Sequence, residues 1–288
     1  MTGGRSIEGT ITHRAQARFV SLSDARALHG ESPVWSFAHQ AIWWVDIAGR
    51  KLLRTTLAGQ TEFWDTPEIP GFVQCLSDDV MVGMQSGIFR FDLSTSQFKR
   101  TVHLDAPGQR FNDACTDAMG RIWAGTMDID NQRANGVLYL YDPTRRTLTS
   151  KIEGFRTVNG LAWDDTRNRL FVSDSHPSVQ TVWTCEIGPD GEMGPCRDFA
   201  RFHNLQGRPD GAALDRAGHY WIAGVGGGSL YRFSPCGTQV SCFSVPLNSP
   251  TKPAFTDAKD AAMVLTSFKD DTDGGRLSIW RTPPRDLD

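Results

Sequence analysis

An internal repeat constrains the fold of this chain more than any other feature of its sequence. Residues 117–125 read Asp-Ala-Met-Gly-Arg-Ile-Trp-Ala-Gly, and residues 215–224 read Asp-Arg-Ala-Gly-His-Tyr-Trp-Ile-Ala-Gly. Each segment precedes a Leu-Tyr strand pattern, at residues 138–143 and 230–235. Weaker copies begin near residues 80 and 165. Self-similarity of this kind is typical of a fold that is built from copies of one supersecondary unit.

The repeated segments themselves predict hairpins. In each one an Asp is followed three residues later by a Gly, at Asp117 and Asp215. Asp accepts hydrogen bonds inside a turn, and Gly adopts the positive φ that a short bulged connection needs. We therefore interpret both acids as turn residues rather than catalytic groups. The alternating apolar residues beside them predict strands, and no stretch has a convincing helical period.

The spacing of polar residues near these turns predicts the number of units. Asn112, Asn159 and Asp210 follow one another at intervals of 47 and 51 residues, and Glu31 lies 81 residues before Asn112. One four-stranded propeller blade takes about 40–50 residues, so these intervals correspond to one, one and two blades. The sequence therefore predicts an all-β, six-bladed propeller.

We expect residues 1–16 to form an N-terminal arm and residues 17–288 to form a single propeller domain. Ring closure is expected between a strand at residues 17–22 and the last blade around residues 276–280, because this pairing would remove the open sheet edges.

The same four polar residues predict a metal-binding central channel. The innermost strand of every blade faces the axis, so residues at equivalent blade positions converge there. Taken singly, Glu31, Asn112, Asn159 and Asp210 are typical of turns or of the surface, and only their shared phase favours a site. Two carboxylates and two amides held together would repel one another or lack partners without a cation. A hard divalent ion with oxygen ligands is the simplest answer.

Composition excludes several other kinds of partner. The net charge is −3 with the signs interspersed, so neither a nucleic acid nor a membrane surface is expected to bind. The first twenty residues contain no apolar run of signal-peptide length, which predicts a cytoplasmic protein. The six cysteines form no Cys-x-x-Cys pair, and we expect them to be reduced, mostly buried thiols. The expected partner is a small molecule.

Other catalytic signatures are weak or absent. The histidines show no metal-ligand spacing, the glycine run at 226–228 lacks the residues of a phosphate loop, and a Gly-x-Ser-x-Gly motif does not occur. A glycosidase with a catalytic pair of carboxylates is an alternative that stays open, because the distance between two carboxyl groups cannot be read from a sequence.

Several short motifs occur in a fixed order along the chain. They are Gly-Glu-Ser-Pro-Val-Trp at 30–35, Trp-Val-Asp-Ile at 44–47, Arg-Phe-Asn-Asp at 110–113, Gly-Arg-Ile-Trp-Ala-Gly-Thr-Met at 120–127, Asn-Gly-Leu at 159–161, Ser-Asp-Ser at 173–175, Arg-Pro-Asp-Gly at 208–211 and Thr-Lys-Pro-Ala-Phe at 251–255. Together they resemble the senescence marker protein/gluconolactonase/regucalcin family of propellers, which includes bacterial sugar-acid lactonases. The resemblance covers the chain from about residue 28 to residue 280.

The resemblance implies roles for individual residues. It implies that Glu31, Asn159 and Asp210 bind one divalent metal ion, with Ca²⁺ expected and Zn²⁺, Mg²⁺, Mn²⁺ or Fe²⁺ as alternatives. It also implies that Arg110 and Asn112 contact the substrate and that Asp210 acts as acid or base. The chain departs from the family at Gln132, where relatives often carry a glutamate that contacts the substrate. This change puts the identity of the substrate in doubt more than the class of reaction.

The sequence thus predicts a metal-dependent hydrolase that opens a sugar-derived lactone of the aldonolactone type. The ion would polarise the carbonyl, and Asp210 would serve as the base, either as an exchanging ligand or beside the attacking water. Asp174 could support the site or merely stabilise a turn. Two rival hypotheses stay open. One is another ester or phosphotriester hydrolase on the same scaffold, and the other is a calcium-binding propeller without catalysis.

Overall fold

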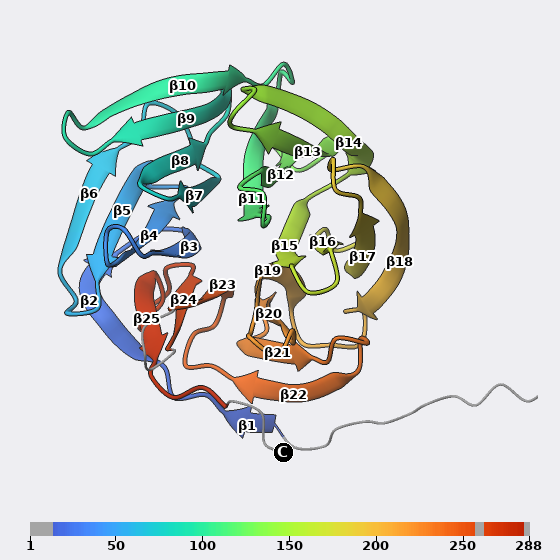
Figure 1. The fold of residues 1–288 in the computed structure, drawn as a ribbon. Helices are drawn as coiled ribbons and strands as arrows, with labels where there is room; N and C mark the ends of the chain where they lie inside the picture. The colour runs from blue at the N-terminus through green and yellow to red at the C-terminus, as the bar shows by residue number, and fades with distance from the viewer. Residues whose placement is uncertain (1–13, 257–261, 285–288) are drawn as a thin grey trace, which may run out of the picture.

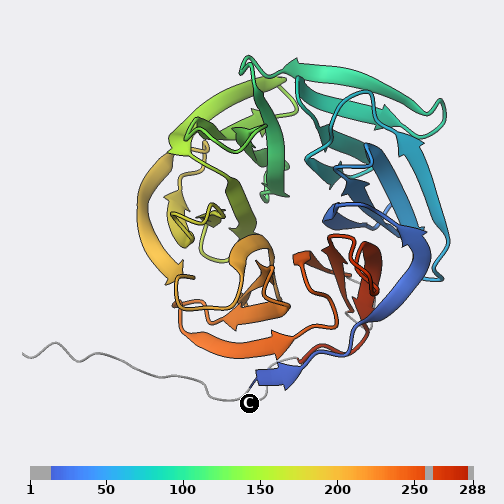
Figure 2. The same cartoon turned by 180° about the vertical axis from the view of Figure 1, so that it is seen from behind.

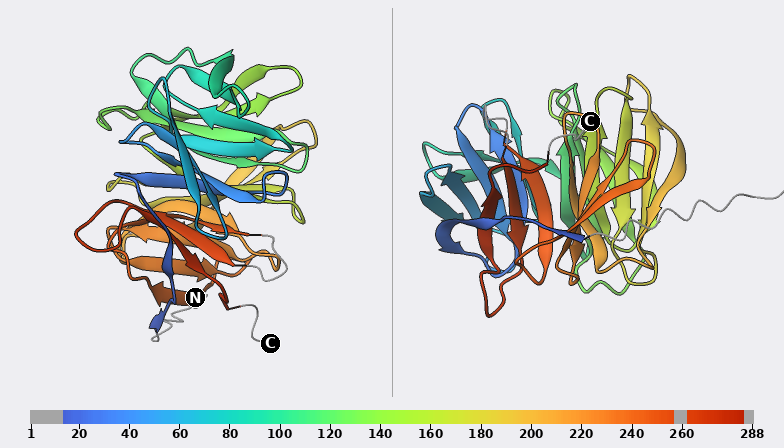
Figure 3. Two further views of the ribbon diagram at one scale, coloured as in Figure 1. Left: turned by 90° about the vertical axis from the view of Figure 1, so that its left-hand side faces the viewer. Right: turned by 90° about the horizontal axis from the view of Figure 1, so that it is seen from below.

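The computed structural model describes residues 14–256 and 262–284, and this part of the chain forms a closed ring of six β-sheets around a central axis (Figure 1). The prediction of a six-bladed propeller is confirmed. Figure 2 shows the same ring from the opposite side, and the side views of Figure 3 show neighbouring blades stacked face to face.

Four blades are plain four-stranded antiparallel sheets, numbered from the axis to the rim. The first blade contains β3 (Gly30–Ser36), β4 (Ala41–Asp46), β5 (Lys51–Thr56) and β6 (Thr61–Asp65). The second contains β7 (Phe72–Leu76), β8 (Asp79–Gly83), β9 (Gly87–Asp92) and β10 (Gln97–His103). The third contains β11 (Gln109–Thr116), β12 (Ile122–Asp128), β13 (Gly136–Asp142) and β14 (Thr147–Phe155). The fourth contains β15 (Val158–Asp164), β16 (Arg169–Asp174), β17 (Thr181–Ile187) and β18 (Met193–Arg201).

The last two blades incorporate strands from the start of the described chain. The fifth contains β19 (Arg208–Leu214), β20 (Tyr220–Val225), β21 (Ser229–Phe233) and β22 (Gln239–Ser244), with β1 (Arg14–Gln16) added parallel to β22. The sixth contains β23 (Pro250–Phe255), β24 (Met263–Ser267) and β25 (Arg276–Trp280), and its rim strand is β2 (Val20–Arg26), antiparallel to β25. The expected closure between the two ends of the chain is therefore confirmed. The predicted arm at 1–16 is described only from residue 14, and its last three residues form β1.

The core lies between the blades rather than inside any one of them. Each of six buried clusters combines side chains from two adjacent sheets. In β12, for example, Ile122 packs toward the second blade and Trp123 packs toward the fourth. Successive residues of a strand point to opposite faces, so a strand that is buried on both faces reads as a continuous apolar run. This explains the sequence Ala-Ile-Trp-Trp-Val of β4, in which every residue is buried.

The turn acids act as the sequence predicts. The Asp117 carboxylate accepts hydrogen bonds from the backbone N–H groups of Met119 and Arg121, and also from the indole N–H of Trp123. Asp215 makes the corresponding bond to the indole of Trp221. These acids therefore orient the tryptophans of the second strands, which are buried in the core.

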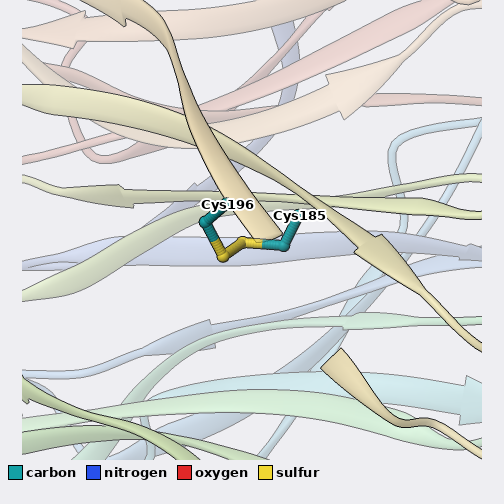
Figure 4. Close-up of a disulfide and its surroundings, with 2 residues drawn as sticks. All are labelled: Cys185 and Cys196. Carbon is teal, nitrogen blue, oxygen red and sulfur yellow. A yellow bond between two sulfur atoms is a disulfide. The ribbon is translucent and has the colours of Figure 1, made fainter. Parts of the chain in front are cut away.

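The expectation that all cysteines are reduced is wrong for one pair. Cys185 and Cys196 form a disulfide across β17 and β18 (Figure 4). The two residues are direct neighbours in the strand register, and their Cα atoms are 4.0 Å apart. The pairing depends on this register, which cysteine spacing does not reveal. Cys75, Cys115 and Cys236 are free thiols; Cys75 and Cys115 are partly buried, and Cys236 is exposed.

Residues 14–256 and 262–284 contain no helix that is long and apolar enough to cross a membrane.

Candidate metal centre and active site

The channel is built from the six innermost strands, β3, β7, β11, β15, β19 and β23, which surround the axis in Figure 1. In every blade except the second, a β-bulge interrupts the pairing of the innermost strand with its neighbouring strand. The pairing of β7 with β8 has no such interruption. A bulge of this kind leaves residues outside the ladder and re-aims their side chains. The four predicted channel residues, Glu31, Asn112, Asn159 and Asp210, lie at these bulges, near the N-terminal ends of the inner strands. We call this end of the channel the mouth.

The four predicted channel residues do not share a single register position, contrary to the expectation from their spacing. Glu31 and Asn159 are the last paired residues before the bulge, whereas Asn112 and Asp210 lie inside it. The offset arises because the residue after Glu31 and the residue after Asn159 adopt positive φ, 51° at Ser32 and 61° at Gly160. Because of these differences in backbone conformation, side chains from two successive register positions meet in the channel, as the hydrogen bond between Asn159 and Asp210 shows.

Gly160 is required at its position by space as well as by conformation. A Cβ atom added there would lie 2.6 Å from the Tyr220 hydroxyl oxygen and 2.7 Å from Ser173 Oγ. The Tyr220 hydroxyl donates a hydrogen bond of 2.7 Å to the Gly160 carbonyl oxygen. The backbone beside Asn159 is therefore held from the neighbouring blade.

Glu31, Asn159 and Asp210 form one buried polar group, with exposed fractions of 6%, 4% and 6%. The Asn159 amide Nδ2 donates a hydrogen bond to Asp210 Oδ1, and its Oδ1 accepts one from the Gly160 N–H. Glu31 accepts a hydrogen bond of 2.6 Å from the Ser32 N–H. The structure thus brings together the three predicted metal ligands from the first, fourth and fifth blades.

Both carboxyl groups are difficult to ionise where they lie. Burial raises the pKa of Glu31 well above its usual range, and the Asp210 and Asp113 carboxylates raise it further. Burial and the Asp113 carboxylate raise the pKa of Asp210 to about 8. A cation between these groups would favour their charged forms and relieve the repulsion. The residues therefore fit a hard divalent ion.

The donors of this candidate site are two carboxylates and one amide oxygen. Across residues 14–256 and 262–284, no group of three or more His, Cys, Asp or Glu side chains is arranged to hold a metal ion. Glu31 and Asp210 supply only two such side chains, and Asn159 brings an amide oxygen as the third. Oxygen ligands of this kind suit Ca²⁺, Mg²⁺ or Mn²⁺ better than Zn²⁺.

A buried ion pair beneath this group was not predicted from the sequence. Lys252 Nζ lies 2.5 Å from Asp113 Oδ1 and also donates to the Ala114 carbonyl oxygen, at 3.0 Å. The other Asp113 oxygen accepts a hydrogen bond of 2.8 Å from the Leu161 N–H. Burial by itself would lower the pKa of Lys252. The negative charge of Asp113 and its hydrogen bond to the ammonium group outweigh this effect and hold the pKa of Lys252 above its usual value. The pair joins the third, fourth and sixth blades across the channel.

Arg110 and Asn112 form the predicted substrate-contacting side of the mouth. The Arg110 guanidinium donates a hydrogen bond of 2.9 Å to Asn112 Oδ1, and the Asn112 amide donates one of 3.0 Å to the Val158 carbonyl oxygen. Burial lowers the pKa of Arg110 to about 10, which still leaves it protonated at neutral pH. Burial and the Arg110 charge lower the pKa of His29 to about 3, so this imidazole is neutral.

Gln132 lies in the loop between β12 and β13, and its side chain turns back to that loop. The amide donates a hydrogen bond of 3.1 Å to the Asp130 carbonyl oxygen. The loop nevertheless contacts the start of β15, where Thr157 Oγ1 donates to Asn131 Oδ1 at 2.8 Å. It therefore borders the same strand as Asn159, although the Gln132 side chain has no hydrogen bond to the other predicted site residues.

Asp174 has a structural role in this arrangement. Its carboxylate accepts hydrogen bonds from the N–H groups of Arg156, Thr157 and His176. These contacts fix the loop that leads into β15. Asp174 therefore positions the strand that carries Asn159 and has no hydrogen bond to Glu31 or Asp210.

The raised pKa of Asp210 predicts how pH affects the stability of the metal-free protein. The ordinary value is 3.8, and in the folded protein it is about 8. Between these values the folded chain keeps a proton that the unfolded chain loses, so the free energy of unfolding falls as pH rises from about 4 to about 8. Urea unfolding of chelated protein across this range should show the decline. In Asp210→Asn the decline should be shallower, and equal slopes in both proteins would contradict the expectation.

Comparison with known proteins identifies relatives for this arrangement. Residues 29–269 match the family model described as the SMP-30/gluconolactonase/LRE-like region. The chain is 32% identical to a 6-deoxy-6-sulfogluconolactonase of Pseudomonas putida, over 87% of each chain. It is 29% identical to an L-arabinolactonase of Azospirillum brasilense, over 80% of this chain and 78% of the relative.

The fold also has close counterparts among solved structures. A calcium-binding protein of Agrobacterium tumefaciens, named regucalcin, superimposes with a TM-score of 0.86 at 22% identity. The alignment covers 93% of this chain and 96% of that protein. At this identity the likeness concerns the propeller fold.

Proposed function

Because this chain belongs to the SMP-30/gluconolactonase/LRE-like family, we propose that it opens a sugar-derived lactone at the mouth of its channel, with the help of one divalent metal ion. The class of enzyme expected from the sequence, a lactone hydrolase, is confirmed by named lactonases at moderate identity over most of both chains. The metal, the residues that bind it and the identity of the lactone belong to the proposal.

One observation carries the proposal from the structure. Two buried carboxyl groups with raised pKa values, Glu31 and Asp210, share the mouth with the amide of Asn159 and the guanidinium of Arg110. Strongly perturbed groups that are gathered in one place are typical of functional sites. A purely structural cluster would gain little from two acids whose charges oppose each other in a desolvated position.

Glu31, Asn159 and Asp210 are the residues that would hold the ion. A divalent ion bound there supplies Lewis-acid polarisation of the lactone carbonyl and lowers the pKa of water. Arg110 and Asn112, fixed to each other by their hydrogen bond, orient the carbonyl and hydroxyl oxygens of the substrate. Asp210 accepts the proton as the water oxygen attacks the carbonyl carbon. The ring C–O bond then breaks, and the leaving oxygen takes up a proton to give the free hydroxyl of the sugar acid.

A pH-drop assay tests this function. Chelated protein should not hydrolyse five- or six-membered aldonolactones, and added Ca²⁺, Mg²⁺, Mn²⁺ or Zn²⁺ should restore turnover in at least one case. Aryl esters and phosphotriesters measured in parallel test the first rival hypothesis, another hydrolase on the same scaffold. Metal binding without turnover of any of these substrates would instead support a calcium-binding propeller without catalysis.

Arg110→Lys is expected to lower kcat/KM for lactones by about 10–100-fold, because Lys lacks the planar fork that contacts two oxygens at once. The affinity for the metal ion should stay unchanged, since Arg110 is not among the proposed ligands. Steady-state kinetics and metal titration measure the two effects separately. Arg145→Lys is the matched control, because this arginine is exposed and its ion pair is with Asp142, away from the predicted site residues. Unchanged kinetics in Arg110→Lys across several lactones would exclude Arg110 as a substrate contact.

The charge of the mouth supports a lactone that carries an anionic group. Arg110, Arg156 and Arg208 form no ion pair with a carboxylate among the described residues, and Arg208 lies close enough to Asp210 to act on its pKa. The relative from Pseudomonas putida is named for a lactone with a sulfo substituent. Gln132 is neutral, so its side chain does not repel an anion.

Gln132→Glu is therefore expected to penalise an aldarolactone, which carries a carboxylate, selectively over a neutral aldonolactone. The physical reason is the repulsion between the new carboxylate and that of the substrate, which is worth about 1 kcal/mol or about fivefold in kcat/KM in a solvated loop. Kinetics with the two substrates measure the ratio. An equal effect on both, or none, would mean that Gln132 does not set specificity.

The location in the cell and the domain limits also stay proposals. A cytoplasmic location is only a prediction, and the Cys185–Cys196 disulfide weighs against it, because disulfides persist mainly in oxidising compartments. Cell fractionation decides this point. The division into an arm at 1–16 and a domain at 17–288 places β1 in the arm, although β1 extends the sheet of the fifth blade.

A further inference from the structure

His29 is a polar side chain at the mouth that takes no part in the proposed mechanism. It lies two residues before Glu31, and the pairing of β3 with β4 is regular up to Glu31, because the bulge begins only after that residue. The Ile47 N–H donates a hydrogen bond of 2.9 Å to the His29 carbonyl oxygen, which extends the ladder to His29 itself. Side chains two residues apart in a strand lie on the same side, about 7 Å from each other. The imidazole is therefore on the same side of β3 as the Glu31 carboxyl group, one step farther toward the opening.

Backbone and ring contacts hold His29 in place. The Asp46 carboxylate accepts hydrogen bonds of 2.9 and 3.0 Å from the N–H groups of Leu28 and His29 and so fixes the backbone. The imidazole stacks on the ring of Phe268, with the centroids 3.8 Å apart and an angle of 22° between the planes. Phe268 follows β24 and faces His29 in an isolated antiparallel bridge, so the stack joins the first and sixth blades. A side chain that is fixed in this way loses little conformational freedom when it binds a ligand.

The ring nitrogens of His29 are free to contact a ligand. The residue is partly exposed, and neither nitrogen has a hydrogen-bond partner in the described part of the chain. Neither is among the polar atoms that are sealed from solvent without a partner. An imidazole carries at least one N–H group, which can donate to an oxygen atom. An apolar ring would stack on Phe268 equally well, so stacking alone does not account for a histidine at this position.

Arg110 approaches the imidazole from the third blade. Besides burial, the positive charge of Arg110 lowers the pKa of His29. The negative charge of Glu31 in turn raises the pKa of Arg110, against the effect of burial. These three side chains therefore border one space at the mouth. A lactone whose carbonyl group lies near the ion proposed at Glu31 would bring its ring substituents to His29.

We propose that His29 is a specificity-determining residue of the lactone site, which donates a hydrogen bond to a hydroxyl oxygen of the sugar lactone. The inference rests on the proposed function, because it places the substrate at the mouth. It implies that part of the preference for hydroxylated lactones over lactones without hydroxyl groups comes from His29. A site that bonds a substrate hydroxyl group discriminates against the analogue that lacks it.

The variant that tests this contact is His29→Phe, which keeps a ring for the stack on Phe268 and removes both nitrogens. With D-glucono-δ-lactone the variant should have a KM that is higher by about 2–10-fold, the usual effect of losing one hydrogen bond. With δ-valerolactone, which has no hydroxyl groups, the kinetics should be unchanged. Calorimetric titration of the Ca²⁺-saturated protein with D-glucono-δ-lactam, which keeps the hydroxyl groups and resists hydrolysis, should show the same loss as a weaker affinity.

The matched control is His103→Phe, since this histidine is exposed on β10, the rim strand of its blade, and the variant should behave as the wild type. Thermal unfolding reports whether each protein folds, and His29→Leu takes the place of His29→Phe if that variant does not. Equal lactam affinity in the wild type and the folded variant would overturn the contact, as would an equal penalty on both lactones. A wild type that binds the lactam but hydrolyses neither lactone would contradict the proposed hydrolysis alone, and weaker lactam binding by His29→Phe would still support the contact.

Discussion

Asp210→Asn should reduce lactone hydrolysis by at least about 10²–10⁴-fold, the usual effect of removing a general base. The change preserves the shape of the side chain and its place beside Asn159, but it removes one of only two carboxylates in the buried group. Loss of that charge should also weaken the binding of the divalent ion. The expected loss of affinity is at least about 10–100-fold, as is found even for groups that only support metal ligands.

The same group predicts that Glu31→Ala, Asn159→Ala and Asp210→Ala each lose metal binding while the propeller stays folded. Removing one acid from a crowded pair relieves repulsion in the metal-free protein, so stability should not fall sharply. Calorimetric titration with Ca²⁺ measures the affinity, and circular dichroism reports the fold. Asp79→Asn is the control, since this acid is exposed and far from the mouth in the register of β8. Any one variant that binds the ion with full affinity would remove that residue from the ligand set.

Lys252→Met is expected to lower the free energy of unfolding by about 3–5 kcal/mol, the typical effect of removing one partner from a buried ion pair. The substitution leaves Asp113 buried without its counter-charge, close enough to Glu31 and Asp210 to raise their pKa values. Methionine fills much of the volume of the lysine stem, so lost packing contributes little. Urea unfolding of chelated protein measures the difference.

A double-mutant cycle and an exposed pair serve as controls for this prediction. Asp113→Asn combined with Lys252→Met removes both charges, so the double variant should be more stable than Lys252→Met alone. Lys51→Met removes an ion pair with Asp65 of similar length, 2.6 Å, but the Asp65 side chain is 81% exposed. That change should alter stability by no more than about 1 kcal/mol. A small effect of Lys252→Met would mean that Asp113 is not charged in the folded protein.

The sequence was sufficient to predict the propeller because each of its repeats carries its own local signals. Asp117 and Asp215 begin turns that recur with the same side-chain contacts to a tryptophan, and such patterns depend only on neighbouring residues. Their spacing counts the blades, and the pairing of β2 with β25 follows from the need to remove sheet edges. These features require no knowledge of distant contacts.

The site was only partly predictable, because its details depend on the bulges. Spacing alone suggested that Glu31 and Asp210 occupy equivalent positions in their strands. In the structure Glu31 is the last paired residue before its bulge and Asp210 lies inside its bulge, an offset of one residue that accompanies the positive φ at Ser32 and Gly160. A bulge changes which side chain faces the channel without leaving a clear trace in composition. Asp113 was overlooked for this reason, although it directly follows Asn112.

Lys252 did leave a signal that could have been used. It is a charged residue in an inner strand, between two prolines, where the neighbouring positions are apolar or small. A lysine that is buried at such a point requires an acid from another blade. The disulfide between Cys185 and Cys196 left no comparable signal, because the separation of 11 residues becomes a direct pairing only in one hairpin register.

The closure of the ring has a consequence for biosynthesis. Arg26 of β2 contacts Gly274 and Asp270 through hydrogen bonds that span 248 and 244 residues of chain. During translation β2 emerges early and has no partner until β25 follows, so an incomplete arc of blades must persist with an unpaired edge. Thr251 Oγ1 of β23 donates a hydrogen bond to the Gly30 carbonyl oxygen, next to Glu31, so a second contact from the last blade helps to position this acid at the mouth. A nascent chain can therefore complete the proposed metal site only after β23 has been synthesised, and a chain truncated before β25 would lack the pairing that closes the ring.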